Sequence, residues 1–94
     1  MSNNHQKFES SMFEYCSNQV ERAYKLFEDG DTENGMQYLA HSADILQMLV
    51  EARNSHGSTS IGDFANAVME LPELEREEVF TFFQSCGFGQ YIPE

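Results

Sequence analysis

The chain has 94 residues, 16 of them acidic and 5 basic, so its formal net charge at pH 7 is −11. This charge repels nucleic acid and anionic membranes, so we expect neither as a direct partner. A chain of this length supports one core, and its hydrophobic fraction of 40% is typical of a folded protein. We therefore expect a single folded domain over residues 1–94.

Targeting and redox features of the sequence favour a cytoplasmic location. The first residues lack the basic stretch followed by an apolar stretch that forms a secretory signal. No apolar run approaches the roughly 18 residues that a membrane span needs. Cys16 and Cys86 lie 70 positions apart, a spacing that metal sites do not use. We therefore expect two free thiols in a reducing compartment.

Two long helices are predicted in the first half of the chain, over about 6–29 and 32–54. In both, apolar residues recur at alternating spacings of three and four, which is typical of one buried helical face. These residues are Phe13, Cys16, Val20, Ala23 and Phe27, then Met36, Leu39, Ala43, Leu46 and Val50. Gly30 favours a left-handed helix end, and Asp31 or Thr32 offers a cap for the second helix. We therefore expect an antiparallel helical hairpin.

Two shorter helices, over about 60–71 and 72–86, complete the prediction of an all-α, compact four-helix domain. Ser60 offers a cap for the first of them, and Pro72 suits the first turn of the next. The hairpin carries extra apolar residues near its open end, which these shorter helices are expected to cover. Residues 1–5 and 89–94 are expected to form flexible or packed tails.

The sequence offers little for catalysis or metal binding. His41 and Asp44 lie three apart, as paired metal ligands do, but no second ligand cluster accompanies them. Glu70 and Glu73 have the spacing of magnesium-binding pairs, which need a matching pair on a facing helix. Neither cysteine is placed beside a base. We therefore expect no enzyme activity, no metal and no cofactor.

The acidic residues gather in groups that could contact a partner. Glu14, Glu21 and Glu28 lie seven apart along the first helix, so neighbours are separated by a rise of about 10.5 Å. Glu28 and Asp29 lie at the C-terminal end of that helix, where the helix dipole disfavours negative charge. A choice that costs local stability points weakly to function. The expected partner-binding residues are Glu14, Glu21, Glu28, Asp29, Asp31, Glu33, Glu70, Glu73, Glu77 and Glu78.

These features favour a non-enzymatic acidic domain that docks on a basic surface of a partner protein. In its narrower form the chain is a nucleic-acid mimic, similar to phage-type inhibitors, that occupies the groove of a nucleic-acid-binding host protein. The alternative is an interaction or adaptor module, or a homodimer, that acts through an exposed apolar face, with the charge serving only solubility. The residues expected to form that face are Met69, Leu74, Phe82 and Tyr91.

Overall fold

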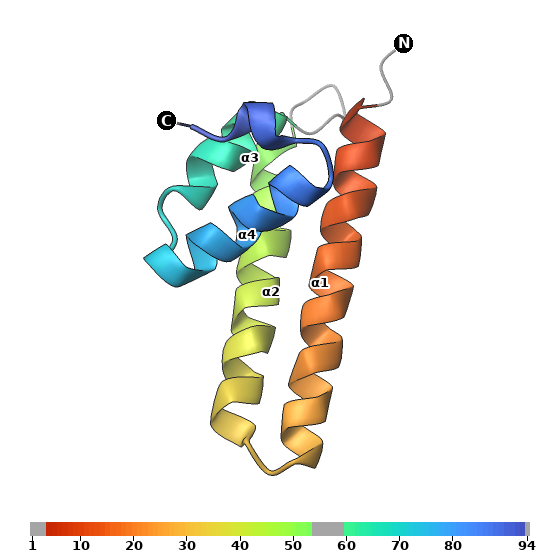
Figure 1. The fold of residues 1–94 in the computed structure, drawn as a ribbon, viewed down its shortest axis with the longest axis vertical. Coiled ribbons are helices and arrows are strands. Elements are labelled where there is room, and N and C mark those ends of the chain that lie inside the picture. The colour runs from red at the N-terminus through yellow and green to blue at the C-terminus, as the bar shows by residue number, and fades with distance from the viewer. Residues whose placement is uncertain (1–3, 54–59, 94) are drawn as a thin grey trace.

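Helices make up the regular structure of the computed structural model, which describes residues 4–53 and 60–93. They are α1 (Asn4–Glu28), α2 (Thr32–Ala52), α3 (Ile61–Val68) and α4 (Glu73–Ser85), followed by a short 3₁₀ turn, η1 (Gly89–Tyr91). The helices α1 and α2 form a long antiparallel hairpin, and α3, α4 and η1 pack beside its open end (Figure 1). The predicted all-α four-helix domain is confirmed, with every helix boundary within three residues of the prediction.

The ends of the helices follow from local sequence. Gly30 has a φ of 88°, and the following Asp31 donates its N–H back to the Leu26 carbonyl at 2.8 Å. Gly87, with a φ of 87°, closes α4 in the same conformation. The Asp31 side chain then caps α2, and the Ser60 hydroxyl accepts from an amide of the first turn of α3 at 3.2 Å. Each of these ends satisfies backbone groups that a helix leaves unpaired.

The helix α3 ends at Val68, three residues before the predicted end. The amides of Met69 and Leu71 bond to carbonyls three residues back, which is the pattern of a tight turn. Pro72 follows, and a proline disfavours helical conformation in the residue before it. The turn therefore separates α3 from α4 and lets the two helices run in different directions (Figure 1).

Four phenylalanine rings from different segments build the core at the open end of the hairpin. They are Phe8 of α1, Phe64 of α3, Phe83 of α4 and Phe88 after α4, each at most 5% exposed. The ring centre of Phe8 lies 5.2–5.6 Å from the other three, edge to face. Such pairs add about 0.5–1.5 kcal/mol beyond the burial of their area. Tyr91, the last residue of η1, and Ile92 pack against this core, so this end of the chain is packed on the domain.

The expected buried face of the hairpin is wrong for α2. All five residues of its periodic stripe are exposed, from Leu39 at 39% to Val50 at 73%. In α1, Phe13 and Val20 are exposed as well, although Cys16 and Ala23 of the same predicted face are buried. The residues that α2 buries are Gly35, His41, Ser42, Ile45 and Leu49.

Close contact between the two long helices explains this choice of face. A Cβ atom at Gly35 would lie 2.8 Å from the ring of Phe27, so a larger residue would require that ring to move. Ser42 is also small and buried, and its carbonyl lies 3.8 Å from the Cys16 Sγ. Small residues let helix backbones approach, which increases packing between them. The other stripe, which places Met36 and Ala43 beside these two positions, is left exposed.

Candidate functional site

Eight exposed apolar residues lie on one side of the hairpin, which we call the back face. Gln19 of α1 and His41 of α2 both bond to side chains of α4, so that side of the hairpin faces α4. Successive residues of an α-helix are rotated by about 100° around its axis. This rotation places the exposed apolar residues of α1 and α2 on the side of the hairpin that faces away from α4. The back face consists of Phe13, Val20, Tyr24, Met36, Leu39, Ala43, Leu46 and Val50.

The antiparallel register places the apolar residues of α1 and α2 opposite one another. The register is fixed by the contacts of Cys16 with Ser42 and of Phe27 with Gly35. In this register the back face consists of cross-hairpin pairs that follow the hairpin axis. Phe13 and Leu46, Val20 and Leu39, and Tyr24 and Met36 fall at matching levels in this register. The exposed apolar residues of the two helices therefore follow the hairpin side by side.

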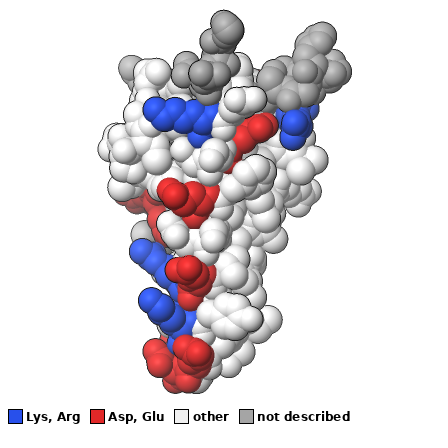
Figure 2. Space-filling view, turned by 90° about the vertical axis from the view of Figure 1, so that its right-hand side faces the viewer, with Lys and Arg blue, Asp and Glu red and all other residues white. Residues whose placement is uncertain are grey.

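Acidic side chains border the back face on both edges. Glu14, Glu21 and Glu28, which we call the acidic row, are exposed along α1. Figure 2 shows acidic side chains in a column along the hairpin, with cations to their left and an uncharged surface to their right over most of its length. The outer edge of α2 carries three further exposed acidic residues. They are Glu33, Asp44 and Glu51.

These six carboxylates form no ion pair with another described side chain. The ion pairs in the described ranges join His41 to Glu75 and Arg53 to Glu9, and neither pair includes an edge residue. Arg53 lies at the open end of the hairpin, where its Nη1 is 3.9 Å from the Glu9 Oε2. The negative charge of both edges is thus available to a partner.

The predicted site residues fall into two separate sets. The acidic row meets Asp29, Asp31 and Glu33 at the closed end of the hairpin, whereas the second set lies on the turn before α4 and on α4 itself. Two of the predicted residues have structural roles. Asp31 bonds to the amide and side chain of Asn34, and Glu78 accepts a bond of 2.9 Å from Gln19. The exposed members of the second set are Glu70, Glu73 and Glu77.

A buried chain of hydrogen bonds joins α1, α2 and α4. The Tyr15 hydroxyl lies 2.7 Å from His41 Nε2, and His41 Nδ1 lies 2.7 Å from Glu75 Oε1. A carboxylate accepts, so we assign the imidazole proton to Nδ1, and Nε2 accepts from the phenol. Burial, reinforced by the negative charge of Glu78, raises the pKa of Tyr15. The phenol therefore remains a donor over the physiological pH range.

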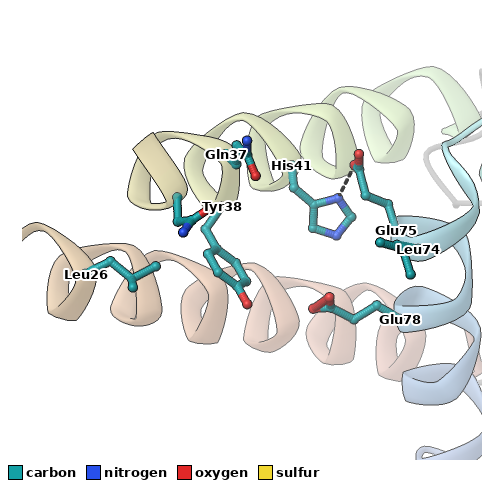
Figure 3. A pocket seen from close by; sticks show the side chains of 8 residues that line it. Leu26, Gln37, Tyr38, His41, Leu74, Glu75 and Glu78 are labelled. Carbon is teal, nitrogen blue, oxygen red and sulfur yellow. Dashed lines mark hydrogen bonds and ion pairs between the residues drawn. The ribbon is translucent and has the colours of Figure 1, made fainter. Parts of the chain in front are cut away.

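This chain of bonds borders a cleft of about 410 Å³ between α2 and α4 (Figure 3). Leu26 and Leu74 supply apolar walls, and His41, Glu75 and Glu78 lie at its α4 end. The order of a hydroxyl, an imidazole and a carboxylate resembles the arrangement that activates a nucleophile. Tyr15, however, is only 4% exposed. The arrangement joins three helices through side chains that lie at or near the buried interior.

The sequence did not reveal this polar network. The sequence spacing pairs His41 with Asp44, but Asp44 is exposed and His41 turns inward to Glu75. Gln19 is likewise buried, and its Oε1 has no partner in the structure. One feature of the sequence does indicate such a network. Gln19 and His41 are polar residues at positions that the helical period places among buried apolar residues.

Cysteine and metal chemistry add no second site in the part of the chain that the structure describes. Cys16 and Cys86 are both free, and burial raises the pKa of Cys16 to about 11, which keeps its thiol protonated. Across residues 4–53 and 60–93, no three His, Cys, Asp or Glu side chains are grouped so as to hold a metal ion. His56 lies outside the described residues. None of the described helices combines the length and apolarity of a membrane span.

Comparison with known protein families, curated proteins and solved structures finds no match to this chain. No residue therefore takes a role from a relative.

Proposed function

We propose that this chain is a non-enzymatic protein-binding domain that docks on a basic surface of a partner protein. The observation that carries the proposal is the acidic row, three exposed carboxylates on one helix that form no ion pair with any side chain of residues 4–53 and 60–93. A helix packed into a hairpin holds such charges in a fixed line. A partner with matching lysine or arginine residues would meet them with little rearrangement.

Charge complementarity alone affects the association rate and the choice of partner more than it affects the affinity. An exposed ion pair contributes only about 0–1 kcal/mol, and salt screens it over about 8–10 Å. Complementary charge nevertheless raises association rates and rejects acidic competitors. Tight binding therefore requires apolar contact beside the acidic row, and the back face offers such contact.

The nucleic-acid mimic is the narrower form of this proposal. Neighbours in the acidic row are about 10.5 Å apart, whereas phosphates of one DNA strand follow at about 3.4 Å along the helix axis. The acidic row thus supplies about one charge for every three phosphates. The second acidic set lies on α4 and the turn before it, away from the line of the acidic row. This arrangement supports docking on a basic protein surface in general better than mimicry of a nucleic-acid strand in a protein's binding groove.

The alternative, an apolar interaction module, is favoured by the exposed back face. The apolar face that the sequence predicts around Leu74 is a different surface, and only part of it is exposed. Leu74 is 81% exposed, whereas Phe82 and Tyr91 pack on the core. On this alternative the charge would serve solubility, and a partner would stay bound at high salt. A salt gradient therefore separates the two functions.

The experiment is capture of partners from a source-cell lysate on the immobilised chain, with elution by a salt gradient. Two variants carry the same change in net charge. The row variant is Glu14→Gln, Glu21→Gln, Glu28→Gln, and the control variant is Glu70→Gln, Glu73→Gln, Glu77→Gln. We expect one basic protein to elute at moderate salt, to be lost by the row variant and to be retained by the control. Equal retention by both variants, or a partner that resists high salt, would contradict acidic docking.

A further inference from the structure

We infer that the back face, bordered by its two acidic edges, is the docking groove for a basic amphipathic helix of the partner. This inference rests on the proposed function and specifies which part of the partner is bound and where. It does not follow from the acidic residues alone. It combines an apolar surface that is exposed among the described residues with the sign of the charge on both sides of that surface.

The back face has the length and the apolar spacing that suit an amphipathic helix. Its α2 residues run from Met36 to Val50, a rise of about 21 Å, which matches about four turns of a helix. Their alternating spacing of three and four forms one ridge, and the apolar residues of α1 form a second ridge beside it. A helix with apolar residues at the same spacing can lie along two such ridges.

The exposure of these side chains indicates a surface that a partner covers. Tyr24, Met36 and Val50 are 68%, 61% and 73% exposed, although α3 and α4 cover other apolar residues of the same hairpin. Contiguous apolar surface beyond a few hundred Å² is uncommon on monomers and is typical of interaction sites. The back face places eight exposed apolar residues on two neighbouring helices, and Figure 2 shows an uncharged surface to the right of the column of acidic side chains over much of the hairpin.

The negative charge at both edges of the back face favours a basic helix as the bound segment. The acidic row borders the groove on α1, and Glu33, Asp44 and Glu51 border it on α2. A helix that carries lysine or arginine on both sides of its apolar stripe would meet opposite charge on both edges. A second copy of this chain would bring acidic edges against acidic edges in any two-fold pairing, which disfavours a homodimer.

The test uses a labelled peptide of about 18 residues that has leucine at helical a and d positions and lysine on both flanks. Binding is measured by fluorescence anisotropy at low and moderate salt. One control peptide has the same composition in scrambled order, and another replaces every lysine by glutamate. The face variant of the protein is Phe13→Ser with Met36→Ser, and its matched control is Leu74→Ser on α4. These side chains are 54%, 61% and 81% exposed, so all three changes should leave the fold intact, as circular dichroism would check.

We expect the amphipathic peptide to bind the natural chain and the Leu74→Ser control equally. Its affinity should fall about tenfold or more for the face variant, and both control peptides should bind weakly. Equal binding of the scrambled peptide, or no effect of the face variant, would overturn the inference. A dimer of the natural chain that the face variant dissociates in sedimentation would overturn it too, because the occupant would be a second copy. Loss of the lysate partner by the row variant but not by the face variant would leave acidic docking in place and remove only this groove.

Discussion

Tyr15, His41 and Glu75 show how polar groups are accommodated inside this small helical domain. Each comes from a different helix, and both bonds between them are 2.7 Å long. Buried polar groups that are satisfied in this way hold helices in a defined relation, whereas an unpaired group costs stability. The network therefore holds α1, α2 and α4 together on the side opposite the back face.

Replacement of Tyr15 by phenylalanine tests the contribution of this network. The change retains the ring but leaves His41 Nε2 buried without a donor, which should lower the free energy of unfolding by about 1–3 kcal/mol. Tyr24→Phe is the matched control, because Tyr24 is 68% exposed and should give little change. Urea denaturation of both variants measures the difference. An equal effect of the two changes would show that the Tyr15 hydroxyl contributes nothing to stability.

The Cys16 thiol gives the stability a dependence on alkaline pH. Its pKa is 9.0 in the unfolded reference and is raised to about 11 by burial in the fold. The native state therefore keeps a proton that the unfolded state releases, so the free energy of unfolding should decrease as pH rises from about 9 to 11. The full loss is on the order of 2 kcal/mol. Denaturation at several pH values should show a shallower decrease for Cys16→Ala, and an unchanged slope would contradict this origin.

Some of these residue-scale features could be read from the sequence and others could not. The acidic row follows from a seven-residue spacing on one helix, which needs only the helical period. The bond from His41 to Glu75 joins residues 34 positions apart on different helices, so it depends on how α4 crosses the hairpin. Spacing within one helix carries no information about such a pair.

At the scale of the elements, capping residues predict where the helices end, whereas apolar periodicity does not predict which face of α2 is buried. Gly30, Asp31 and Ser60 act within a few residues of chain, so their roles depend little on tertiary structure. The second helix carries two apolar stripes, and periodicity cannot tell which of them is buried. The small residues Gly35 and Ser42 decide it, because they allow α1 to approach the stripe that contains Ile45 and Leu49.

Substitution of two helical glycines by alanine tests this packing. At Gly35 the new Cβ would lie 2.8 Å from the Phe27 ring, so we expect a loss of about 1–3 kcal/mol despite the better helix propensity of alanine. At Gly62 of α3 no atom lies within 4 Å of the new Cβ, so the same change should be neutral or slightly stabilising. Thermal denaturation compares the two variants. A stable Gly35→Ala variant would mean that the hairpin does not require this close approach.

At the scale of the whole molecule, an excess of negative charge is carried on an elongated body of 46 × 26 × 22 Å. The hairpin extends beyond α4, and its closed end carries Glu28, Asp29, Asp31 and Glu33 (Figure 1). Repulsion among unpaired carboxylates destabilises the folded state, and salt screens it. The charge distribution therefore has a stability cost that a basic partner would remove.

This repulsion predicts a response of the melting temperature to salt. An increase from about 20 to 200 mM sodium chloride shortens the screening length from roughly 20 Å to below 10 Å, so the melting temperature should rise. The row variant should melt higher than the natural chain at low salt, and the difference should shrink as salt increases. Scanning calorimetry of both proteins measures it. A melting temperature that falls with salt would show that attractive charge pairs dominate instead.

Binding through the back face is tested most directly by methyl NMR of the chain together with its captured partner. Val20, Leu39 and Leu46 carry methyl groups on the back face, and Leu74 carries methyl groups on α4. We expect the partner to shift the methyl signals of the first three residues and to leave those of Leu74 unchanged, with the shifts reversed by salt. Shifts confined to Leu74 and its surroundings, with an unchanged back face, would contradict this mode of binding.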